Sequence, residues 1–150
     1  MKDRAHCTLA ALPKRMILPK KVIIHLIIFV VMWLNATSAR NGISVEFSPR
    51  EIVTQLKIDF AKHCRVSFGA YVEASKDADI TNTMRSRTHP CIALGPSGNL
   101  QGFIKCFDLE TGMVVKRRNV TELPMPEDII TKVSEWGRKT LKEQFQHKNF

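Results

Sequence analysis

The segment from Val66 to Val120 constrains the fold most, because short apolar runs alternate there with turn residues. From Val66 to Ala74 every second residue is apolar, which is the period of a half-buried strand. Gly95–Asn99 indicates a loop, and Glu110–Gly112 indicates a hairpin turn whose glycine supplies a positive φ. No gap is long enough for the crossover that a parallel sheet needs. The sequence therefore predicts a small antiparallel β-barrel or meander over residues 63–122.

The preceding region, residues 1–62, is predicted to be helical and contains the apolar run Val22–Leu34. This run is shorter than the about 20 residues of a membrane span, and it has no polar face, so a soluble helix here would need cover on all sides. Ser48, Pro49 and Glu51 predict the start of a second, short helix that ends between residues 55 and 57. We interpret the apolar run as a buried helix of a larger assembly.

A secretory signal is the alternative interpretation of the same region. The start of the chain is cationic, small residues follow the apolar run, and Asn35 and Asn119 each begin a glycosylation pattern. Against it, His25 interrupts the apolar run, and cleavage would remove Cys7 and leave three cysteines.

Residues 123–150 are predicted to form a proline-rich linker and an amphipathic helix that starts near Pro126. Mixed steps of three and four residues separate the apolar positions, which favours packing on the β-domain over binding to a membrane surface. Gly137 is expected to weaken this helix by about 1 kcal/mol relative to alanine. The stripe consists of Ile129, Val133, Trp136, Leu141 and Phe145.

Composition narrows the classes of partner. The formal charge of +9 favours nucleic acid or an anionic membrane surface, although a solvated basic face gives the same charge. The four cysteines lack zinc-ligand spacing and are expected to be buried free thiols. Asp77 and Asp79 lack the glycine and glutamate of a calcium loop. The sequence thus predicts no metal site and no cofactor.

Several motifs follow one another in an order that resembles the integrase region of copia-type retrotransposon polyproteins. The resemblance extends from about Leu12 to about Gly137. The motifs are Trp33–Ala36, Asn41–Ser44, Ser48–Val53, Lys62–Val72, Arg85-x-Arg87-Thr88, Leu94–Gly102, Thr111–Arg118 and Leu123–Pro126. Phe103 departs mildly from the residue that many relatives have after the last glycine of the Leu94–Gly102 motif.

This resemblance implies a domain organisation and a cellular location. Residues up to about 60 would be the last helices of a ribonuclease-H-like catalytic core, and residues 66–121 would be a Src-homology-3-like barrel. The two aspartates and the glutamate that hold metal in such integrases would lie upstream of Met1, so the resemblance implies a chain without catalytic residues. It also implies a nuclear or cytoplasmic retroelement complex, with the secretory pathway as the alternative.

We expect the β-domain to bind nucleic acid, DNA above all, without strong sequence preference and through phosphate contacts. Strand geometry places Lys116 and Arg118 on one face and Arg117 on the other. A solvated strand edge is the alternative for these cations. Two further alternatives remain for the chain: a module for self-association or polyprotein assembly, and a secreted or membrane-anchored basic protein. The candidate nucleic-acid-binding residues are Arg85, Arg87, Lys105, Lys116, Arg117 and Arg118.

Overall fold

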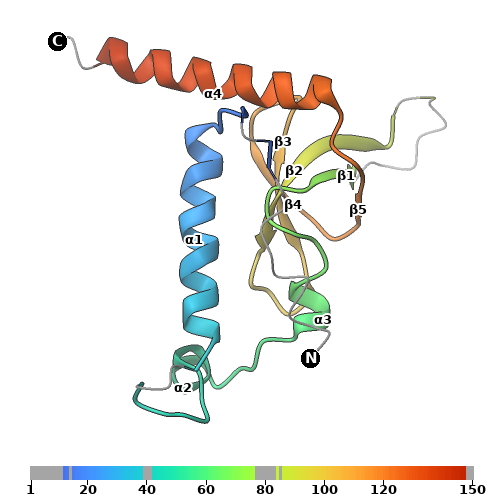
Figure 1. The fold of residues 1–150 in the computed structure, drawn as a ribbon. Coiled ribbons are helices and arrows are strands. Elements are labelled where there is room, and N and C mark those ends of the chain that lie inside the picture. Colours follow the sequence, from blue (N-terminus) through green and yellow to red (C-terminus); the bar gives the residue numbers. More distant parts are fainter. Residues whose placement is uncertain (1–11, 14, 39–41, 77–83, 85, 148–150) are drawn as a thin grey trace.

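The computed structural model describes residues 12–13, 15–38, 42–76, 84 and 86–147. These residues form four helices and five strands. Three helices precede the strands and the fourth follows them, so helices and strands are segregated along the chain as predicted (Figure 1). The helices are α1 (Lys20–Ala36), α2 (Pro49–Thr54), α3 (Phe60–His63) and α4 (Glu127–His147). The strands are β1 (Tyr71–Ser75), β2 (Thr88–Pro96), β3 (Ile104–Asp108), β4 (Val114–Arg117) and β5 (Val120–Glu122).

The five strands form one antiparallel sheet in the order β4-β3-β2-β1-β5. The prediction of an antiparallel domain is confirmed. Of the two predicted forms, barrel or meander, the closed barrel is not formed, because β4 and β5 are the two edges of an open sheet. Only residues 118 and 119 separate these two strands. From Arg117 to Val120 the chain can span at most about 11 Å, so the sheet must curl until its two edges approach each other at this end.

The inner face of the curled sheet is lined by small side chains from all five strands. Ala70, Val72 and Ala74 pack there as the alternating pattern predicts, whereas Phe68 packs on the outer face. Gly69, with a φ of 85°, interrupts the alternation between them. The inner core consists of Ala70, Val72, Ala74, Cys91, Ala93, Ile104 and Cys106, with Val66, Val115 and Val120 packed against it.

The outer face of the sheet is covered by two helices. α1 contributes Val22 and Phe29, and the Phe29 ring lies 5.1 Å from that of Phe68. α4 crosses one end of the sheet (Figure 1) and buries Ile129 and Val133 on it. Helices and sheet therefore share this outer core.

The apolar helix α1 is covered on one side, not on all sides as the sequence led us to expect. Its other side exposes Ile23, Ile24, Ile27, Ile28, Val30, Val31 and Leu34. Ile27 and Leu34 keep 60% and 66% of their surface accessible. In the described part of the chain, no helix combines the length and the apolar character needed to cross a bilayer.

Two further predictions for the helices are confirmed, and one is corrected. Ser48 and Glu51 form a complete capping box at the start of α2, and Gln55 ends that helix in the left-handed conformation. In α4, Ile129 and Val133 are buried as predicted, but Leu141 is 45% exposed. The C-terminal part of α4 extends beyond the sheet (Figure 1).

The cysteines divide into two kinds. Cys91 and Cys106 are free and buried in the inner core, as predicted. Cys64 is disulfide-bonded, so the expectation of a free thiol at this position is wrong. The prediction rested on cysteine spacing, which carries no information on a pairing set by the fold.

Candidate nucleic-acid interface

Lys105 on β3 and Lys116 on β4 are directly paired across the sheet. Their strand neighbours Phe107 and Val114 belong to the outer core, so both lysines point to the side of the sheet that the helices cover. Like charges in such a pair repel each other. An anion above the pair would remove that repulsion, so this position is suited to a phosphate group.

Arg117 lies on the opposite face, as the strand geometry predicts. Its neighbour Val115 packs on the inner core, and its positive charge acts on the thiols of Cys91 and Cys106. Burial nevertheless dominates and raises the pKa of both thiols to about 12. Arg117 therefore does not share a surface with Lys105 and Lys116.

A second group of basic residues gathers at the end of the sheet where β4 passes into β5. The Arg65 guanidinium donates a hydrogen bond to the carbonyl oxygen of Arg118. Nearby, the backbone N–H of Lys76 donates to the carbonyl oxygen of Arg87 over 2.8 Å. Arg118 and Arg87 are predicted site residues, whereas Arg65 and Lys76 were not expected from the sequence.

One backbone contact connects these two pairs. The N–H of Ser75, at the end of β1, donates to the carbonyl oxygen of Asn119 over 3.1 Å. Because Ser75 precedes Lys76 and Asn119 follows Arg118, the four basic residues converge at one end of the sheet. Arg85, and the Asp77–Asp79 segment considered for calcium, lie outside the described residues.

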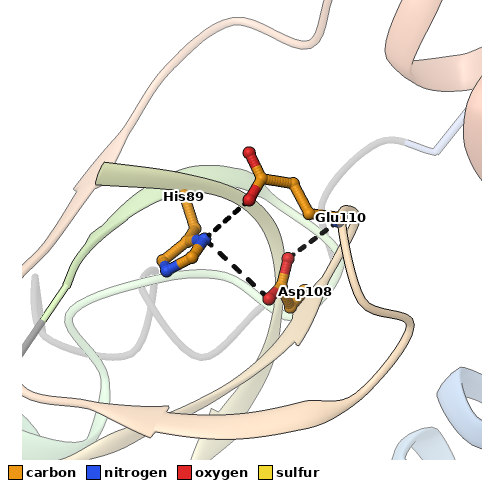
Figure 2. A group of neighbouring side chains, drawn as sticks. All are labelled: His89, Asp108 and Glu110. Atoms are coloured by element: carbon orange, nitrogen blue, oxygen red, sulfur yellow. Dashed lines mark hydrogen bonds and ion pairs between the residues drawn. The ribbon is translucent and has the colours of Figure 1, made fainter. Parts of the chain in front are cut away.

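A separate polar cluster lies at the β3–β4 turn, where Figure 2 shows His89, Asp108 and Glu110 pointing toward one another. The His89 Nδ1 atom is 3.0 Å from Glu110 Oε2 and 3.9 Å from Asp108 Oδ2. His89 is on β2, and the pairing of Cys91 with Asp108 brings it beside the turn. The sequence analysis missed this cluster, since only the register of β2 and β3 assembles it.

The three side chains could hold a divalent metal ion, because one nitrogen and two carboxylate oxygens lie within 4.8 Å of one another. Ligands of a tetrahedral zinc ion are about 3.4 Å apart when the bonds are about 2.1 Å. Hydrogen bonds already account for the carboxylate of Asp108, which accepts from the N–H of Glu110 over 2.8 Å and from the hydroxyl of Thr111 over 2.9 Å. The cluster is thus explained as the support of the β3–β4 turn.

Comparisons of the chain with protein-family models, with curated proteins and with solved structures found no match.

Proposed function

We propose that this chain is a non-catalytic, nucleic-acid-binding module of an integrase-type retroelement polyprotein. The observation that carries the proposal is the direct pairing of Lys105, which is partly exposed, with Lys116, which is exposed. The convergence of basic residues at the β4–β5 end supports it. Phosphate contacts of this kind give affinity without sequence preference.

The finer fold that we propose is a partly open Src-homology-3-like barrel. Its support is the strand order, in which the consecutive strands β4 and β5 occupy opposite edges, and the inner core that all five strands share. The exposed apolar side of α1 would pack against the catalytic core of a complete integrase. We place the protein in a retroelement complex of the nucleus or cytoplasm.

Charge reversal tests the proposal. The double variant Lys116→Glu, Arg118→Glu should bind duplex DNA more weakly than the unaltered chain. The slope of log affinity against log salt concentration should become less negative by about 1 for each lost phosphate contact. The matched control is Lys132→Glu, Lys142→Glu, which makes the same charge change at exposed positions of α4.

The DNA affinities of the two double variants, compared with each other, show whether binding depends on the sheet or on net charge. Equal losses in both would assign DNA binding to net charge alone, and unchanged binding of the sheet variant would refute the interface. Multimers of the purified chain that ignore DNA at low salt would instead support the assembly function.

Two observations favour a second candidate, a secreted basic protein. The disulfide of Cys64 is typical of oxidising compartments, and Asn119, which begins a glycosylation pattern, is exposed. Expression in a eukaryotic cell tests this candidate. A mass decrease of the product on glycosidase treatment would support secretion, and an unglycosylated intracellular product would contradict it.

A further inference from the structure

A groove of about 230 Å³ lies between α1, α2 and the loop that joins β2 to β3. Its ionisable lining residues are His25 from α1, Arg50 from α2 and Lys105 from β3. No acidic side chain is found among the described residues that line it. The groove therefore brings together two cations, Arg50 and Lys105, and the imidazole of His25 from three different elements.

Within the described parts of the chain, none of these three side chains takes part in an ion pair. The Nε atom of Arg50 is buried and has no hydrogen-bond partner within the described structure, which is a costly state for a polar atom. Lys105 faces Lys116, another cation. Burial and, second, the charge of Lys105 lower the pKa of His25, so these two groups interact electrostatically. An anion in the groove would provide a counter-charge for Arg50 and Lys105.

The size of the groove indicates what kind of anion it takes. Pockets for whole drug-sized molecules measure about 300–1,000 Å³, so a volume of about 230 Å³ suits a single group of a longer molecule. An arginine guanidinium binds phosphate oxygens through two parallel hydrogen bonds. Lysine and histidine can contact the remaining oxygens.

We propose that this groove binds one backbone phosphate of a nucleic acid strand. The inference rests on the proposed function and extends it, because Lys105 belongs both to the groove and to the Lys105–Lys116 pair. A nucleic acid strand bound in the groove would continue over the Lys105–Lys116 pair. The groove would thereby fix the path of the strand relative to α1 and α2.

The test uses the full chain with two ligands, inorganic phosphate and a short DNA duplex. We expect phosphate to shift the NMR signals of the His25 ring in a saturable manner, whereas chloride at equal ionic strength does not. Arg50→Gln should weaken phosphate binding at least tenfold and lower the salt slope of DNA binding by about 1. Lys105→Gln, which leaves α2 untouched, provides a second variant, and Arg138→Gln on the exposed side of α4 is the control.

The outcomes separate this inference from the proposed function. DNA binding that Arg50→Gln leaves unchanged but Lys105→Gln weakens would overturn the groove as a phosphate site while the interface itself stands. Phosphate binding in the groove by a chain that does not bind DNA would overturn both the nucleic-acid ligand and the proposed function. Binding of anionic phospholipid vesicles but not of DNA would likewise overturn the inference.

Discussion

Gly137 in α4 is the position where we expect alanine to act against its intrinsic helix preference. On propensity alone, Gly137→Ala would stabilise the helix by about 1 kcal/mol. A Cβ atom at this position, however, would lie 2.4 Å from the carbonyl oxygen of Ile17 and 2.8 Å from its Cγ2 atom. The N–H of Ile17 donates to the hydroxyl of Ser134 over 3.3 Å, so this backbone is held against α4.

The clash should decide whether Gly137→Ala stabilises or destabilises the protein. Overpacking of a tight contact costs about 1–3 kcal/mol, and the upper part of that range applies because the obstacle is backbone. After the gain in propensity is subtracted, we expect a net loss of about 1–2 kcal/mol, which lowers Tm by about 2–8 °C in a chain of this size.

Thermal and urea unfolding, followed by circular dichroism, measure this loss. The control is Arg138→Ala, one residue further along α4 and exposed, which should change stability by less than about 0.5 kcal/mol. If Gly137→Ala were as stable as the unaltered chain or more so, the close packing of α4 on the segment before α1 would be refuted.

Three further predictions follow from buried or partly buried groups. Asp108→Asn should destabilise the protein by about 1–3 kcal/mol, since this carboxylate is only 3% exposed and accepts hydrogen bonds inside the β3–β4 turn; an unchanged urea midpoint would contradict this. Because burial, and secondly Lys105, lower the folded-state pKa of His25 below 6.5, the unfolded chain binds the proton more readily, so stability should fall as pH drops through and below about 6.5. His25→Gln should flatten that part of the stability–pH curve, and an identical curve would exclude His25 as its origin. With pKa values of about 12, Cys91 and Cys106 should resist alkylation near neutral pH until the protein is denatured, and rapid labelling of the native protein would show that the inner core opens.

The local features of the fold could be predicted from the sequence because each depends on neighbouring residues. Ser48 and Glu51 are three residues apart and make their capping box without help from the rest of the chain. The turn at Gly112 was likewise predicted from the positive φ that glycine accepts, which is 67° here. The two faces of β4 follow from strand geometry, which is why the separation of Arg117 from Lys116 was foreseen.

The features that depend on distant residues could not be predicted. Lys105 faces Lys116 only because of the register of β3 and β4, and Arg50 joins the groove only because α2 packs beside α1. The packing of Gly137 could not be predicted either, since the cost of glycine to the helix is visible in the sequence but its contact with Ile17 is not. Whether the sheet closes depends on edge pairing that alternation does not encode.

The most direct test of the proposed nucleic-acid interface is the affinity of the unaltered chain for a short DNA duplex of arbitrary sequence, measured over a series of salt concentrations. We predict binding at low salt that weakens as a straight line on log–log axes, with a slope of about −0.9 for each phosphate contacted, and little difference between duplexes of unrelated sequence. Two contacts, one at the Lys105–Lys116 pair and one at the Arg118 end, would already give a slope near −1.8. No binding at low salt, or an affinity that salt does not change, would contradict the assignment of this basic sheet to nucleic acid.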